Sequence, residues 1–175
     1  MWWILLVLLA VIAGVLIVSY NALVRDHHRV LAAWSDIEVQ LKRRHDLIPR
    51  LVEVVKQYAA YEQAALGTLT ELRNRARAGH QPTEQGELER QLSRSLFNIR
   101  AVAEAYPDLK SNQNYLELMQ QLTEIERDIQ FARRYYNGAV NNLNTRIDSF
   151  PDLIVARLLR YRPAEYFDFD EGEAA

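Results

Sequence analysis

The feature that most constrains this chain is an apolar segment near its N-terminus. Every residue from Trp2 to Val18 is apolar or glycine, and the first charged residue is Arg25. At about 1.5 Å of rise per residue, roughly 23 helical residues reach about 34 Å, more than the hydrocarbon thickness of about 30 Å. The segment predicts a membrane-spanning anchor over residues 1–24, so the lipid bilayer is the first expected partner.

A cleaved signal peptide is the competing interpretation of this segment. Such a peptide needs a basic N-terminal region, a shorter apolar core and a cleavage site of small residues. No Lys or Arg precedes the apolar run, and Ser19, Tyr20 and Asn21 do not form such a site. We therefore expect an uncleaved anchor.

The charges that follow the segment predict its orientation. Arg25, Arg29 and the basic run 42–44 all lie after it, and basic residues near a span are retained on the cytoplasmic side. We expect a short N-terminus outside and residues 25–175 in the cytoplasm. The absence of cysteine agrees with a reducing compartment. The net charge of -2 does not indicate nucleic acid as a partner.

The apolar pattern continues past the anchor at helical spacing. No Pro or Gly interrupts the chain between Gly14 and Pro49, and the pattern predicts one helix from about residue 2 to about residue 44. His27 takes the skipped position of this stripe. Its apolar members are Tyr20, Leu23, Val30, Trp34, Ile37 and Leu41.

The run of ionisable residues after Leu41 predicts the end of that helix. Lys42, Arg43 and Arg44 would be cations in a last turn, where they interact favourably with the helix C-terminus. Residues 45–49, HDLIP, would form a tight turn, with Asp46 as a cap and Pro49 in the first turn of a second helix.

Three more helices and a tail follow from the remaining pattern. Gly79 suits a helix C-cap, Pro107 closes the third stripe, and the fourth alternates steps of three and four as a heptad-like seam. The predicted ranges are a second helix to about 78, a loop over 79–86, helices over 88–106 and 115–143, a short helix over 153–159 and an acidic tail over 163–175. We expect the tail to be mobile, with docking through Tyr166 and Phe167 as the alternative.

These elements predict an all-α fold. The N-terminal transmembrane helix would be continuous with an antiparallel up-down four-helix bundle, followed by the short C-terminal helix and the acidic tail. The predicted domains are the anchor over 1–24, the cytoplasmic bundle over 25–162 and the tail over 163–175.

Three segments resemble the motifs of the LemA family in order and spacing. They are WSDIEVQLKRRHDLIPRLVEVVKQYAAYE at 34–62, AYPDLKSNQNYLELMQQL at 105–122, and ARRYYNGAVNNLNTRIDSFPDLIVA at 132–156. The resemblance implies a bacterial single-pass protein of the inner membrane with a mostly cytoplasmic helical bundle, and it brings no catalytic residue or cofactor. It also implies that some relatives are linked to membrane-organelle formation and that others are encoded beside membrane metalloproteases. Arg50 and Tyr61 depart from the family pattern.

Two pairs of neighbouring residues that contain histidine are the candidates for a catalytic or metal-binding site. His45 and Asp46 would make an acid and base pair, but adjacent residues at a helix boundary rarely converge on one substrate, and spacing places no nucleophile beside them. His27 and His28 point about 100° apart on a helix, so they do not form a chelating pair. We predict no catalytic, cofactor-binding or metal-binding residue.

Glu62 interrupts the apolar stripe of the second predicted helix. A carboxylate there must be partnered, exposed at the end of the bundle, or functional. If it is buried, Arg133 or a tyrosine hydroxyl is the expected partner. The candidate tyrosines are Tyr58, Tyr106, Tyr135 and Tyr136.

Residues 133–136, RRYY, mix basic and aromatic side chains as nucleic-acid binders do. Because Tyr136 belongs to the heptad seam and its neighbours fan around the helix, no single basic face is expected. Four asparagines follow, which either hydrogen-bond across a subunit contact or lie on a solvated face. They are Asn137, Asn141, Asn142 and Asn144.

The sequence therefore predicts a non-enzymatic, membrane-anchored helical scaffold that self-associates as a homo-oligomer or organises membrane proteins. Small residues in the span, Ala10, Ala13 and Gly14, permit close helix approach. The alternative is an accessory factor or adaptor for a membrane protease in envelope quality control, docked through the acidic tail. Deletion of residues 163–175 would separate the two hypotheses.

Overall fold

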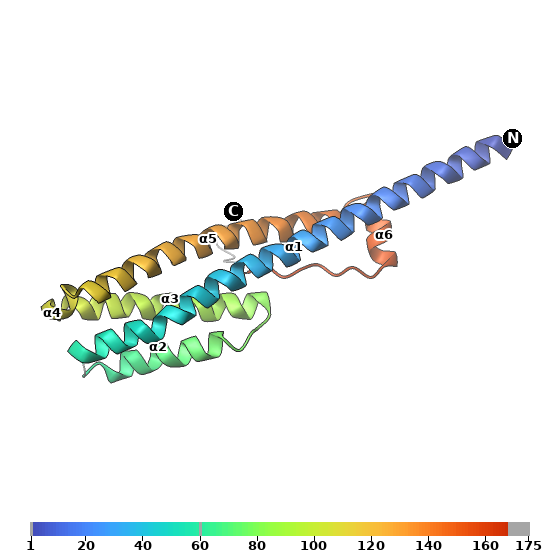
Figure 1. Cartoon of the computed structure of the whole chain (residues 1–175). Coiled ribbons are helices and arrows are strands. Elements are labelled where there is room, and N and C mark those ends of the chain that lie inside the picture. Colours follow the sequence, from blue (N-terminus) through green and yellow to red (C-terminus); the bar gives the residue numbers. More distant parts are fainter. Residues whose placement is uncertain (1, 60, 168–175) are drawn as a thin grey trace, which may run out of the picture. The chain divides into compact units, whose positions relative to one another are not determined.

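The structure is a computed structural model, and it describes residues 2–59 and 61–167. Within these residues the chain is all-helical, as predicted, and contains no strand (Figure 1). The helices are α1 Trp2–Tyr58, α2 Gln63–Ala76, α3 Pro82–Glu104, α4 Pro107–Lys110, α5 Gln113–Asp148 and α6 Asp152–Leu158.

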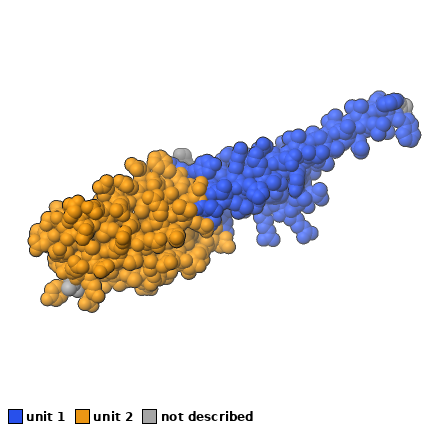
Figure 2. Space-filling view, viewed as in Figure 1, with its two compact units in different colours: residues 1–35, 134–165 blue, residues 36–133, 166–175 orange. Residues whose placement is uncertain are grey.

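The chain divides into two compact units (Figure 2). Unit 1 comprises residues 1–35 and 134–165, and unit 2 comprises residues 36–133 and 166–175. Helices α1 and α5 contribute residues to both units.

The predicted turn at residues 45–49 is wrong, because α1 continues through Pro49 to Tyr58. A proline inside a helix leaves the carbonyl four residues earlier without its amide donor. Here that carbonyl belongs to His45, and Nε of Arg73 on α2 donates to it at 3.1 Å. A side chain from another helix thus replaces the missing donor, which lets the helix continue.

The first chain reversal of unit 2 lies instead between the end of α1 at Tyr58 and the start of α2 at Gln63. The single stripe predicted from Ile48 to Ala76 is therefore divided between two helices, although Leu51, Val55 and Leu69 on it are fully buried. Helix α3 begins at Pro82, so the loop between α2 and α3 is shorter than the loop predicted at 79–86.

The apolar seam of α5 is confirmed. Its members are buried or half-buried along the whole helix, and its first residue, Tyr115, is 4% exposed. The predicted short C-terminal helix is also confirmed, as α6.

The apolar start of α1 is covered by little else in the structure. Among the described helices, α1 is the one long and apolar enough to cross a membrane. Its large side chains from Trp2 to Val18 are mostly exposed, with Leu9 at 69%. After this segment α1 joins the core of unit 1 through Leu23 and Val30, and Trp34 packs against Tyr136 of α5 with ring centroids 5.4 Å apart.

The C-terminal segment returns along α5 within unit 1. The side chain of Asn144 donates to the Ala164 carbonyl at 3.0 Å and accepts from the Ala164 amide at 2.8 Å. The Tyr136 hydroxyl donates to the Glu165 carbonyl at 2.8 Å. In unit 2, Phe167 is buried, in agreement with the alternative that it docks the start of the tail, whereas residues 168–175 lie outside the described residues.

Candidate functional site

A buried polar network in unit 2 is the candidate site, and Arg44 of α1 stands at its centre. The Arg44 side chain is 1% exposed. Its Nη1 donates to Glu126 Oε2 of α5 at 2.6 Å and to Ser93 Oγ of α3 at 2.8 Å. Its Nη2 donates to the carboxylate of Glu89 on α3. One guanidinium therefore links three helices.

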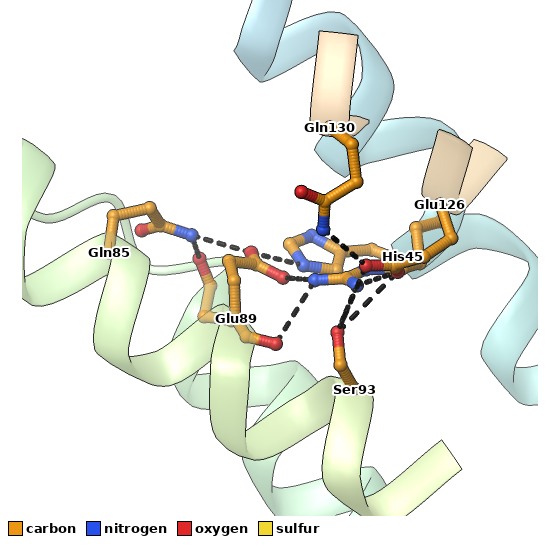
Figure 3. A network of polar contacts seen from close by, with 8 residues as sticks. His45, Gln85, Glu89, Ser93, Glu126 and Gln130 are labelled. Carbon is orange, nitrogen blue, oxygen red and sulfur yellow. Dashed lines mark hydrogen bonds and ion pairs between the residues drawn. The ribbon is translucent and has the colours of Figure 1, made fainter. Parts of the chain in front are cut away.

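Glu89 is the second centre of the network (Figure 3). Its side chain is 4% exposed, and Oε1 contacts His45 Nε2 at 2.8 Å and accepts from Gln85 Nε2 at 2.7 Å. Gln85 Nε2 also donates to the Ala76 carbonyl of α2 at 3.0 Å. The network therefore includes all of α1, α2, α3 and α5.

These contacts decide the charge of Glu89. Burial by itself raises the pKa of the Glu89 carboxyl, but the hydrogen bond with His45 and the positive charge of Arg44 together outweigh it. The pKa of Glu89 is consequently lowered from its ordinary value of 4.5, and the buried group is a carboxylate at neutral pH.

A small cavity lies beside the network, with a volume of about 140 Å³. Arg44, Glu89, Ser93 and Glu126 line it, together with Phe167. The Nε atom of Arg44 is buried and has no hydrogen-bond partner within the described residues. A water molecule takes about 30 Å³, so the cavity has room to hydrate a polar atom of this kind.

The predicted helix end at Lys42, Arg43 and Arg44 and the predicted cap at Asp46 are both wrong. Lys42, Arg43 and Arg44 do not end a helix, and Arg44 is buried in an ion-pair network. His45 pairs with Glu89, while its neighbour Asp46 points to the exposed face of α1 and caps no helix. The structure does not bring His45 and Asp46 together as a pair.

The chemistry available to the network is ion pairing and hydrogen bonding. The Ser93 hydroxyl contacts Arg44 and Glu126 rather than His45, so the histidine and serine do not form a base and nucleophile. A buried network that connects several helices in this way favours one register between them.

Glu62 has one of its predicted partners. The Tyr106 hydroxyl donates to Glu62 Oε1 at 3.4 Å. Nearby, the Asn112 side chain donates to the Tyr58 hydroxyl at 3.0 Å. Tyr136 belongs to unit 1, and burial raises its pKa to about 12.

His27 and His28 lie on the exposed side of α1 in unit 1. Their ring centroids are 6.2 Å apart, and His27 also packs edge-on against Tyr161 at 5.9 Å. The charged residue on the buried face of this part of α1 is Asp26, which sequence reasoning did not single out. Within residues 2–59 and 61–167, no group of three His, Cys, Asp or Glu side chains stands where it would hold a metal ion.

The basic and aromatic run 133–136 divides between the two units after Arg133. Tyr136 is buried and Tyr135 is 61% exposed, so the run does not present one face. Of the four asparagines, Asn144 ties the C-terminal segment to α5, a role that neither predicted alternative included.

Sequence reasoning missed Arg44, Gln85 and Glu89 as buried residues. A signal for two of them was present, because Gln85 and Glu89 precede the fully buried Leu92 by seven and three residues on α3. Those are positions of the same helical face. Because both residues are polar, they were not counted as members of that buried face.

An all-helical chain with one apolar helix of spanning length fits a membrane protein. The chain belongs to the LemA family, whose model matches residues 33–175. This confirms the resemblance drawn from the three motifs.

Relatives of this chain include proteins of two names. Magnetosome proteins MamQ 1 and MamQ 2 of Paramagnetospirillum magneticum are each 27% identical over 178 residues, which cover 87% of this chain and 65% of each relative. Protein LemA of Metamycoplasma hominis is 27% identical over 154 residues, which cover 87% of this chain and 70% of that protein. The match thus spans less than two thirds of the MamQ proteins.

Proposed function

We propose that this protein is a non-enzymatic, membrane-anchored helical scaffold that self-associates or organises other membrane proteins. The observation that carries the proposal is the composition of α1. This single helix of 57 residues contains the exposed apolar segment and also buried core residues such as Ile37 and Leu51. An element of this kind links a bilayer directly to a folded helical unit.

The proposed scaffold is an antiparallel four-helix bundle built in unit 2 from parts of α1 and α5 and from α2 and α3. The contacts of Arg44, Glu89 and Gln85 support this arrangement, because they connect all four helices. We propose the inner membrane as the location, with the N-terminus outside, since Arg25 and Arg29 follow the apolar segment.

The chemistry of the candidate site supports a structural role. Glu89 contacts both Arg44 and His45, through an ion pair with the arginine and a hydrogen bond with the histidine. The family description and the names of the relatives denote no enzymatic activity.

Self-association through the span is supported by Ala10, Ala13 and Gly14, which share one helix face. A Cβ atom added at Gly14 would meet nothing within 4 Å. Small residues of this spacing let a second helix approach closely in a bilayer.

The test is the mass of the full-length protein in native-lipid discs. We expect a defined multiple of the 20.4 kDa chain, and we expect Gly14→Leu to reduce it because a large side chain separates the helices. Val15→Leu, on another face of the helix, is the matched control and should leave the mass unchanged. A monomer in discs without any bound protein contradicts the proposal.

A second protein found in fixed ratio would instead indicate the adaptor for a membrane protease. The deletion that separates these functions must spare residues 163–167, because Ala164, Glu165 and Phe167 pack within the described units. Removal of residues 168–175 should leave the scaffold assembled and should abolish docking through an acidic tail.

A further inference from the structure

An apolar stripe lies uncovered on and just before α6. It consists of Phe150, Ile154 and Leu158, which are 81%, 54% and 78% exposed. We call these three residues the α6 stripe. Their spacing of four puts Ile154 and Leu158 on one face of the helix, and Phe150 lies just before the helix begins. Large apolar side chains gathered in this way mark an interaction surface.

The other face of α6 is buried in unit 1. Val155 and Ala156 are 5% and 1% exposed. The helix is therefore held on the unit by one face, while its opposite apolar face has no protein cover among the described residues. An amphipathic helix normally exposes polar groups there.

An ion-pair chain places α6 at the end of the apolar segment of α1. Asp152 of α6 accepts from Arg146 Nη1 at 2.9 Å, and Nε of the same arginine donates to Asp26 of α1 at 2.5 Å. Asp26 is 3% exposed and lies two residues beyond Val24, where the apolar segment ends. All three residues belong to unit 1.

The position of α6 therefore follows from that of the anchor. Where the apolar segment crosses a bilayer, Asp26 stands at the membrane surface, and α6 stands beside it. In Figure 1, α6 runs crosswise to α1, which is the direction of a helix lying in the membrane plane.

Basic residues predominate in the segment that carries the stripe, with the exposed acids Asp148 before it and Glu165 after it. Arg157, Arg160 and Arg162 are exposed. Asp152 is the one acidic residue in 151–162, and Arg146 already pairs with it. Arginine side chains can lay their apolar stems on a membrane and hold the guanidinium at the phosphate level.

The backbone conformation of Arg160 ends α6. Arg160 has φ of 56°, the left-handed conformation that favours glycine. The helix ends in a Schellman motif, with the Tyr161 amide donating to the Ala156 carbonyl at 2.9 Å and the Arg160 amide to the Arg157 carbonyl at 3.2 Å.

We propose that α6 is a membrane-surface element, which inserts the α6 stripe into an anionic lipid surface beside the anchor and pairs its arginines with lipid phosphates. The inference rests on the membrane anchor of the proposed function. It adds a second membrane contact, which would fix unit 1 against the bilayer rather than leave it on a single helix.

The test uses the full-length chain in vesicles of phosphatidylcholine and phosphatidylglycerol with brominated acyl chains. Because the protein has no cysteine, a single introduced thiol carries a polarity-sensitive fluorophore at a known site. Leu158→Cys reports on α6, and Leu9→Cys reports on the anchor. Phe97→Cys, an apolar residue of α3 that is 69% exposed, is the matched control in unit 2.

We expect strong quenching of the label at positions 9 and 158 and several-fold weaker quenching at position 97. Quenching at position 9 but not at 158 overturns the inference and leaves the anchor intact. No quenching at position 9 refutes the anchor itself. A blue-shifted but unquenched label at 158 overturns the inference in favour of a second protein chain on the stripe.

The arginines are tested in the Leu158→Cys background. Replacement of Arg157, Arg160 and Arg162 by Gln should reduce quenching at position 158 in phosphatidylglycerol vesicles. The same variant should match its parent in vesicles of phosphatidylcholine alone, because these lack net negative charge. An equal loss of quenching in both kinds of vesicle, or no loss in either, contradicts the proposal that the arginines pair with lipid phosphates.

Discussion

The guanidinium of Arg44 on α1 donates to the carboxylate of Glu89 on α3, and the two side chains are 1% and 4% exposed. Removal of one partner leaves the other charge buried without compensation, which typically costs about 3–5 kcal/mol. We expect Arg44→Met to lower the free energy of unfolding by this amount. The combined change with Glu89→Leu should recover most of it. Chemical unfolding followed by circular dichroism measures both.

Arg43→Met is the control for this prediction. Arg43 lies next to Arg44 but is 53% exposed, and it pairs with Asp128 at 3.4 Å. A surface pair of this kind contributes about 0–1 kcal/mol. Equal effects of the two arginine substitutions would show that the network does not stabilise unit 2.

The lowered pKa of Glu89 predicts a pH dependence. Since its pKa in the folded protein lies below the ordinary value of 4.5, its contribution to stability is fully present above that pH. The contribution is lost as the pH falls through the folded-state pKa. We expect the gap in melting temperature between the wild type and Glu89→Gln to narrow below pH 4.5. A gap that stays constant or widens contradicts the assignment.

The hydrogen bond from Arg73 to the His45 carbonyl predicts coupling with Pro49. Arg73→Ala should cost about 1–3 kcal/mol, because the buried carbonyl loses its donor. Pro49→Ala should stabilise by up to about 3 kcal/mol, since an amide at position 49 can bond the same carbonyl. In the Pro49→Ala background, the Arg73 substitution should cost less. Purely additive effects in this double-mutant cycle would refute the inference that Arg73 replaces the amide donor that Pro49 lacks.

The bond from the Ala164 amide to the Asn144 side chain predicts local protection from hydrogen exchange. Asn144→Ala removes the acceptor. A hydrogen bond contributes about 0.5–1.5 kcal/mol, so exchange of that amide should rise roughly 2- to 10-fold. Asn142→Ala, at an exposed position of the same helix, should leave it unchanged. An Ala164 amide that exchanges equally fast in both variants contradicts the prediction.

Several elements of the fold were predictable because their signals are local. The apolar segment, the seam of α5 from Tyr115 to Leu143 and the short helix after Pro151 each depend on residues within a few turns of one another. Helical periodicity needs no knowledge of distant partners.

The first chain reversal was not predictable in this way. Pro49 and the cluster around Arg44 are strong local stop signals, whereas the true break at 59–62 contains neither Pro nor Gly. The helix continues at Pro49 because Arg73, 28 residues away from His45, supplies the missing donor. A contact over that distance leaves no trace in local spacing.

The sequence by itself determined that the chain is helical, that it carries one apolar segment long enough to span a bilayer, and that it belongs to the LemA family. Tertiary structure alone decided where the helices end and which polar groups are buried. Arg44 is a surface cation by its neighbours in sequence and a core residue by its partners, Glu89 and Glu126. The physical reason is that a charge can be buried only where opposite charges from other helices meet it, and only folding brings those helices together.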